Sequence, residues 1–190
     1  MEAFAASTGV VCLAEIGDKT QLLALVLATR FRAPAPIVAG ILVATLANHA
    51  LAALAGVAVA EWLQSPALRW ALGLSFVAMG LWTLEPDRLD ADEAPAKPRY
   101  GPFLTTVVVF FLVEIGDKTQ IATMALAAQF QDLVLVTAGT TLGMMLANAP
   151  AVFAGNFVAL RLPLKAIRLA AAALFIVLGA FVCLEAGGLV

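Results

Sequence analysis

Long stretches without charge alternate with short polar junctions along this chain. Two 28-residue stretches, from Ala33 to Ala60 and from Leu133 to Leu160, contain no Asp, Glu, Lys or Arg. Each exceeds the ~20 apolar residues that a helix needs to cross the hydrocarbon core of a bilayer. Division at the polar and proline-rich junctions predicts six apolar segments, at 4–29, 35–60, 67–85, 102–130, 133–159 and 164–186. The pattern therefore predicts an all-α integral membrane protein with six transmembrane helices.

A hydrophilic stretch separates the third predicted segment from the fourth. Residues 85–99 include three prolines, five acidic residues and three basic residues. This composition is typical of a solvated connector and not of a membrane span. We therefore expect a first three-helix unit at 1–85, an acidic linker at 86–101 and a second three-helix unit at 102–190.

The two units carry the same sequence motif. Leu13 to Gln21 reads LAEIGDKTQ, and Leu112 to Gln120, 99 residues later, reads LVEIGDKTQ, so eight of nine positions are identical. The same offset aligns further positions in all three predicted helices: Ala39 and Gly40 with Ala138 and Gly139, Ala55 and Gly56 with Ala154 and Gly155, Arg69 with Arg168, Phe76 with Phe175, and Gly80 with Gly179. The chain therefore contains two copies of a repeated unit of three predicted helices.

An odd number of spans in each repeat requires the second repeat to enter the membrane from the opposite side, which is the inverted-repeat construction. Eight of the nine arginines and lysines outside the two motifs lie in or beside the three loops on one side, and Arg69 alone lies on the other. By the positive-inside rule those three loops, including the acidic linker, are cytoplasmic and both termini lie outside. We expect a multi-pass protein of a bacterial-type cell inner membrane.

Composition agrees with this class of protein. Hydrophobic residues make up 63% of the chain and charged residues only 13%, whereas about a quarter of the residues in a soluble domain are charged. The net charge of −2, without a basic run or face, gives no sign of a nucleic-acid partner. The two cysteines, Cys12 and Cys183, lie in apolar segments and suggest neither a disulfide framework nor a zinc site.

The repeated motif places acidic residues in the middle of apolar segments. Glu15 and Asp18 lie near the centre of the first segment, and Glu114 and Asp117 near the centre of the fourth. A charged residue at the bilayer centre costs ~2.5–3.5 kcal/mol, so these side chains need partners or a function. In a continuous helix the i, i+3 spacing would place the two carboxylates of one motif on one face, roughly 4.5 Å apart along the axis.

Two such faces directed at a shared midplane would form a cage of hard oxygen donors. Gln21 and Gln120 extend the acidic faces by a further i+3 step. Carboxylate and amide oxygens suit Mn²⁺, Ca²⁺ or Mg²⁺ better than softer ions. Gly17 and Gly116, between the acids of each motif, weaken the helix and could expose carbonyls to an ion or form a hinge.

The motif lysines admit two interpretations. Glu15 with Lys19 and Glu114 with Lys118 are i, i+4 pairs in the favoured order, which would merely let a polar helix pack inside the bundle. That interpretation leaves the two aspartates unexplained. Alternatively the lysines are internal counter-charges while the acids serve a ligand. Four carboxylates less two ammonium groups then leave two negative charges, which one divalent ion would neutralise.

The doubled E-x-G-D-K-T motif, on the first and fourth segments and joined by an acidic linker, resembles a family of divalent cation/proton antiporters once catalogued as uncharacterised. Its members are described as bacterial manganese exporters and as Golgi and chloroplast Mn²⁺/Ca²⁺ transporters. The resemblance covers the whole chain, and neither motif departs from the pattern. It implies that Glu15, Asp18, Glu114 and Asp117 handle the metal, and that Lys19, Thr20, Lys118 and Thr119 complete the motifs.

The resemblance further implies a secondary transporter and not an enzyme, with the two repeats forming one transport domain. Its substrates would be Mn²⁺, or Ca²⁺, exported from the cytoplasm, and protons; no cofactor is expected. Charge balance predicts about two protons for each divalent ion, because two protons would neutralise the site once the ion leaves. Carboxylates this close should titrate as coupled groups.

Weaker candidates lie in the second and fifth segments. His49 is the only histidine, and its repeat equivalent is Asn148. A metal or proton role is compatible with this position, and so is a packed or pore-adjacent histidine; the shared polarity, with Asn48 beside it, favours cavity lining. Met144 and Met145 offer thioether sulfur to a soft ion, but methionine is also common filler in membrane helices.

Two rival functions remain at this stage. Ile-Gly-Asp occurs in two membrane segments, as in intramembrane aspartyl proteases, but positions 15 and 114 are Glu where those enzymes have Gly. A passive divalent cation channel would show flux without proton coupling. The sequence leaves the ion, Mn²⁺ or Ca²⁺, and the presence of a homo-oligomer open.

Overall fold

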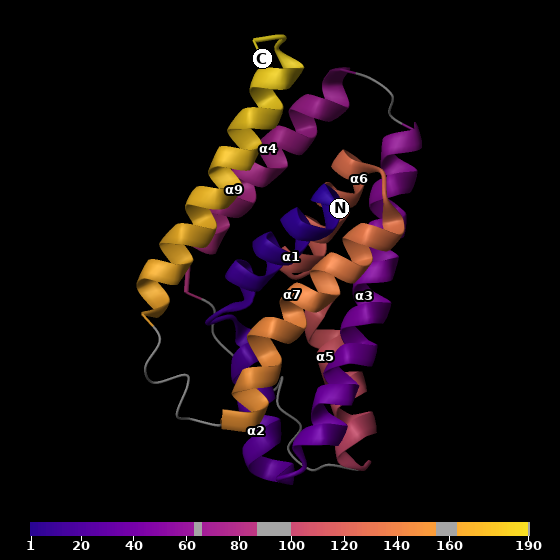
Figure 1. Ribbon diagram of the computed structural model, residues 1–190, viewed down its shortest axis with the longest axis vertical. Helices are drawn as coiled ribbons and strands as arrows, with labels where there is room; N and C mark the ends of the chain where they lie inside the picture. Colours follow the sequence, from indigo (N-terminus) through magenta and orange to yellow (C-terminus); the bar gives the residue numbers. More distant parts are fainter. Residues whose placement is uncertain (63–65, 87–99, 155–162, 190) are drawn as a thin grey trace.

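The structure, a computed structural model, describes residues 1–62, 66–86, 100–154 and 163–189 (Figure 1). These residues form eight α-helices and no strand. The helices are α1 (Glu2–Glu15), α2 (Lys19–Phe31), α3 (Pro34–Trp62), α4 (Pro66–Thr83), α5 (Pro102–Glu114), α6 (Lys118–Phe130), α7 (Leu133–Ala154) and α9 (Leu164–Ala186). The predicted all-α class is confirmed, while most of the acidic linker and the predicted end of the fifth segment lie outside the described residues.

The first and fourth predicted segments are each broken into two helices. The break follows Glu15 in the first repeat and Glu114 in the second. Gly17 has φ +87° and Gly116 has φ +79°, a left-handed conformation that glycine adopts without steric cost. The prediction that the two acids of a motif share one continuous helix face is therefore wrong, because the glycine between them ends the helix.

The aspartate of each motif begins the next helix. The Asp18 side chain accepts a hydrogen bond from Thr20 N at 3.2 Å, and the Asp117 side chain accepts one from Thr119 N at 3.3 Å. These are N-caps, which satisfy backbone donors that the first turn of a helix leaves unpaired. One acid of each motif thus ends a helix and the other starts one.

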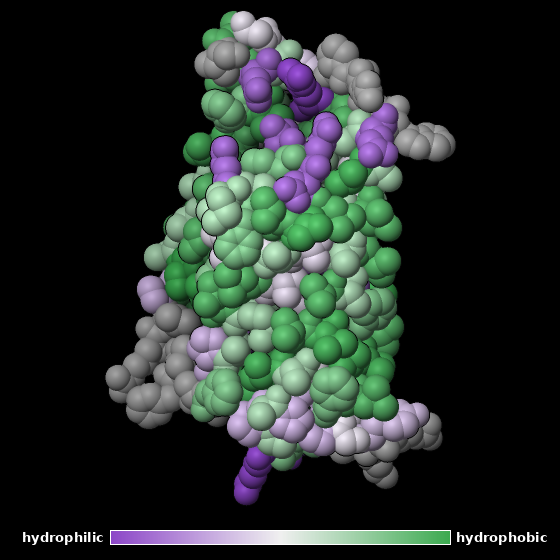
Figure 2. Space-filling model, turned by 45° about the vertical axis from the view of Figure 1, so that its right-hand side comes forward, coloured by the Kyte–Doolittle hydropathy of each residue, from purple (hydrophilic) through white to green (hydrophobic). Residues whose placement is uncertain are grey.

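Within the described residues, three helices are long and apolar enough to span a bilayer: Pro34–Glu61, Leu133–Phe153 and Leu164–Ala186. Two further apolar helices, Ala67–Thr83 and Pro102–Glu114, are shorter. On the face in Figure 2, hydrophilic side chains gather at the two ends and hydrophobic ones form a broad band between them. This distribution is that of a protein whose middle is solvated by lipid.

Close packing at small residues holds the helices together. Figure 1 shows α4 and α9 side by side along one flank, where Gly73 and Gly179 let the two backbones approach and the rings of Phe76 and Phe175 stack at 6.5 Å. Elsewhere Gly40 of α3 lies against Thr106 of α5, and Gly139 of α7 lies against α1. Since lipid is as apolar as leucine, such backbone approach is a main source of helix association in membranes.

Candidate metal centre

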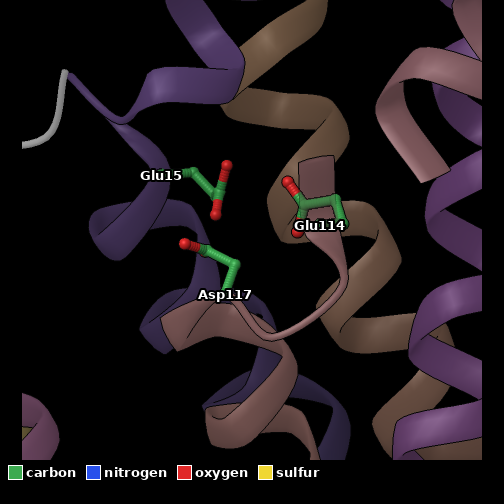
Figure 3. Close-up of side chains that lie close together, drawn as sticks. All are labelled: Glu15, Glu114 and Asp117. Atoms are coloured by element: carbon green, nitrogen blue, oxygen red, sulfur yellow. The ribbon is translucent and has the colours of Figure 1, made fainter. Parts of the chain in front are cut away.

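The four helix ends created by the two breaks meet inside the molecule. Glu15 ends α1 and Glu114 ends α5, while Asp117 caps the start of α6. Figure 3 shows the carboxyl groups of these three residues directed toward one another from three separate elements. One carboxylate oxygen from each lies within 4.8 Å of the other two. We call Glu15, Glu114 and Asp117 the carboxylate cluster.

The cluster is sealed from solvent within the protein. Glu15 and Glu114 have no exposed surface, and Asp117 is 5% exposed. The C-terminal ends of α1 and α5 add the partial negative charge of their last carbonyls. Such a concentration of negative charge in a low-dielectric interior requires a cation or protons to balance it.

Threonine hydroxyls orient the carboxylates. Thr20 Oγ1 lies 2.7 Å from Glu15 Oε2, and Thr119 Oγ1 lies 3.2 Å from Glu114 Oε2. The other oxygen of each glutamate, Oε1, is buried and has no hydrogen-bond partner in the part of the chain that the structure describes. Each glutamate thus has one oxygen fixed by a threonine and one that can accept a ligand.

The motif lysines pair with the aspartate of the opposite repeat. Lys118 Nζ lies 2.6 Å from Asp18 Oδ1, and both side chains are almost fully buried, at 3% and 0% exposed. Lys19 Nζ lies 3.6 Å from Asp117 Oδ1, with 20% of the lysine side chain exposed. These ion pairs cross between the two motifs, whereas one interpretation of the sequence paired each lysine with the glutamate of its own motif.

The two motif glutamines form hydrogen bonds with the backbone at the helix breaks. Gln21 Oε1 accepts a hydrogen bond from Gly17 N at 3.0 Å, and Gln120 Oε1 accepts one from Gly116 N at 2.8 Å. Gln21 Nε2 also donates to the carbonyl of Ala147 at 2.9 Å. The predicted supporting residues therefore hold the loops that carry the acids.

Of the weaker candidates, the structure brings Asn148 to the cluster. Asn148 Nδ2 lies 3.5 Å from Glu15 Oε2 and 2.8 Å from Met144 Sδ. Asn48 Nδ2 donates to the carbonyl of Phe111 at 3.0 Å. His49 is fully buried and neither ring nitrogen has a partner among the described residues, but it is not one of the three residues whose ligand atoms converge.

A cavity of about 210 Å³ lies beside the carboxylate cluster and reaches Asp18. Its lining includes Asp18, Gln21 and Lys118, and also Thr83 from the end of α4 and Leu164 and Arg168 from the start of α9. Nothing in the sequence places these last residues near the motif, because their approach depends on how α9 packs against α1 and how α4 packs against α6 and α9.

The family and relatives of the chain agree with this chemistry. The sequence model of the family described as "Divalent cation/proton antiporter GDT1" matches residues 3–91 and 102–188. A protein of Vibrio cholerae named "Putative manganese exporter" is 52% identical over 94% of this chain and 88% of its own length. GDT1-like proteins of Synechocystis and Arabidopsis thaliana are 32% and 28% identical, over 92% and 94% of this chain and 93% and 94% of their own lengths. No solved structure matches.

Proposed function

The chain belongs to the GDT1 family of divalent cation/proton antiporters, and from this membership we propose that it exports Mn²⁺ from the cytoplasm in exchange for protons. The family consists of transporters, which excludes the aspartyl protease suggested by Ile-Gly-Asp. The relative named as a manganese exporter supports Mn²⁺ as the ion. The metal is then a substrate that passes through the protein, and Ca²⁺ is the competing candidate.

The observation that carries this proposal is the convergence of Glu15, Glu114 and Asp117 at the ends of broken helices. Three hard oxygen donors within 4.8 Å of one another match the preference of Mn²⁺ and Ca²⁺ for oxygen ligands. Helices broken at the membrane midplane are where secondary transporters bind their ions. We assign these three residues, with Asp18, to the metal.

The lysines set the charge of the site so that one divalent ion and two protons can replace each other there. With Lys19 and Lys118 paired to Asp117 and Asp18, the four acids retain two negative charges, which a divalent ion or two protons would balance. To use Asp18 as a ligand, the ion must displace or share the ammonium group of Lys118. Binding of the ion would thereby alter the contact between α2 and α6, and this gives the ion a means to change the conformation.

The architecture proposed for this cycle is six spans in two inverted repeats, at 1–85 and 102–190, which together form one transport domain. In Figure 1, α2 ends, α3 begins and α7 ends toward the lower end of the molecule, whereas α3 and α9 end and α4 begins toward the upper end. Arg30 and Arg32 lie where α2 ends and α3 begins, so under the positive-inside rule that end is cytoplasmic and both termini are external, and we place the protein in the inner membrane. A cysteine at position 92 should therefore resist impermeant reagents in intact cells, and its labelling would reverse the orientation.

Metal flux into proteoliposomes tests the function. Purified protein would be reconstituted with a pH dye inside, and uptake compared across Mn²⁺, Ca²⁺, Mg²⁺ and Zn²⁺. We expect Mn²⁺ to be transported and protons to move in the opposite direction. Transport of Ca²⁺ with exclusion of Mn²⁺ would reassign the substrate, and metal flux without proton movement would indicate a channel.

A further inference from the structure

Helix α7 carries a line of polar side chains that leads to the carboxylate cluster. Thr137, Thr141 and Asn148 are four and seven residues apart, a spacing that places them on one helix face. Thr137 lies in the second turn of α7, and Asn148, about 16 Å further along the axis, contacts Glu15. We call these three residues the α7 stripe.

The two threonine hydroxyls of the α7 stripe differ from those of most buried threonines in the described part of the chain, and only Thr45 Oγ1 of α3 resembles them. Both side chains are 6% exposed, and neither Oγ1 has a hydrogen-bond partner among the residues that the structure describes. Other buried threonines turn the hydroxyl back to the carbonyl four residues earlier, at 2.7–2.9 Å: Thr83, Thr106, Thr123 and Thr140. Thr137 and Thr141 do not make this bond.

The unpaired groups continue to the cluster. Asn148 Oδ1 and Glu15 Oε1 are likewise buried without a partner in the described part of the chain. Buried polar groups are stable only when something bonds them, and water is the usual partner when no protein group is available. Three of these atoms belong to one face of α7 and the fourth to Glu15, which Asn148 contacts, so together they offer bonding partners to a file of water molecules.

The α7 stripe occurs in one repeat only. The positions equivalent to Thr137 and Thr141 in the first repeat are Val38 and Leu42, both apolar. The stripe starts near the beginning of α7, on the right of Figure 1, whereas the cavity beside Asp18 is lined by residues from the end of α4 and the start of α9, on the left. The two approaches to the centre thus differ in chemistry and lie on different sides of the molecule.

We propose that the α7 stripe lines a hydrated route by which protons travel between the α7 start of the molecule and the carboxylate cluster, while the metal ion enters through the cavity beside Asp18. The proposal rests on the proposed function and adds a separate path for the second substrate. A proton passes along such a file when each hydroxyl or water accepts one proton and releases another, so no stripe residue gains a net charge and no bond to carbon changes.

The test compares neighbouring threonines of α7. Thr137→Val with Thr141→Val removes the two unpaired hydroxyls at nearly constant shape, whereas Thr140→Val removes a hydroxyl that only bonds the backbone of its own helix. In proteoliposomes with a pH dye inside, we expect Mn²⁺-driven proton movement to be about tenfold slower in the double variant than in the wild type. We also expect the ratio of the rate in H₂O to the rate in D₂O to be larger for the double variant. Thr140→Val should behave as wild type, and equilibrium Mn²⁺ binding should be unchanged in all variants.

Conservative variants keep the test decisive. Thr137→Ser and Thr141→Ser retain the hydroxyls and should retain exchange, which separates a lost proton path from a packing defect. Exchange by the double valine variant at the wild-type rate, or equal slowing by the serine variants, would overturn the route. A wild-type protein that moves Mn²⁺ without protons would overturn the proposed function itself and is recognised before any variant is compared.

Discussion

At the scale of single residues, burial gives the four motif acids their importance. Glu15, Asp18 and Glu114 are at most 1% exposed, and Asp117 is 5% exposed. A carboxylate in such a place must be balanced by a cation, a proton or a donor, because its hydration is lost. In the proposed function, each acid is balanced by the ion or by the charges that replace it.

Neutralising any one motif acid should abolish metal transport. Glu15→Gln, Asp18→Asn, Glu114→Gln and Asp117→Asn each remove a charge at nearly constant shape, so the protein should still insert. Mn²⁺ flux in proteoliposomes measures the loss, with Glu61→Gln, an exposed acid near the end of α3, as the matched control. Full transport by two of the four variants would mean that the acids are structural.

The two crossed ion pairs should differ in their contribution to stability. Removing one partner from a buried pair leaves an uncompensated charge and costs about 3–5 kcal/mol, so Lys118→Met should strongly lower the thermal unfolding midpoint in detergent. Lys19→Met should have a smaller effect, because its ion pair is longer and more exposed.

A double-mutant cycle isolates the buried pair. Asp18→Asn combined with Lys118→Met removes both charges and should recover part of the stability lost by Lys118→Met alone. Additive losses would show that the 2.6 Å contact does not couple the two side chains.

Sequence reasoning at this scale identified the acids, the lysines and their depth, and it left the partners of the lysines open. Composition and spacing located Glu15 and Glu114 in the middle of apolar segments, and both are buried. The pairing of Lys118 with Asp18 depends on two loops 99 residues apart meeting in space, and i, i+4 arithmetic within one helix cannot represent that.

At the scale of helices, the breaks at Gly17 and Gly116 are what bring the acids together. In a continuous helix, Glu15 and Asp18 would project from the same face of one helix. The break instead makes Glu15 a helix end and Asp18 a helix start. The sequence indicated a weak point at each glycine, but the left-handed turn follows from the capping and the ion pairs of the folded site, which no local pattern shows.

Alanine at the breaks should therefore damage the protein. A left-handed residue with a side chain costs about 1–2 kcal/mol, so Gly17→Ala and Gly116→Ala should both lower thermal stability and transport. Gly17→Ala should be the worse, since its new Cβ would lie 3.0 Å from Leu164 Cδ2, whereas nothing lies within 4 Å of a Cβ at position 116.

Gly9→Ala is the control for the glycine variants. Gly9 lies inside α1 with nothing within 4 Å of an added Cβ, so alanine should be neutral or stabilising there. Equal damage at positions 9, 17 and 116 would indicate that alanine disturbs the bundle and not the breaks.

At the scale of the whole molecule, the long apolar stretches predicted a helical membrane protein correctly, and the family confirms transport. The prediction that each of the six segments is one continuous helix was wrong for the first and fourth segments, because each of these is a pair of half-helices. The cavity beside Asp18 and the α7 stripe could not be predicted from the sequence, because each depends on which helix faces pack together and not on composition.

The central claim is that one Mn²⁺ exchanges for about two protons at a site whose net charge is the same in both loaded states. The most direct measurement is Mn²⁺ flux in proteoliposomes under an imposed pH gradient, with the membrane potential clamped by potassium and valinomycin at several values. We predict that the pH gradient accelerates flux and that voltage has little effect, because two protons replace two charges. Flux that ignores the pH gradient, or that depends steeply on voltage, would contradict the account.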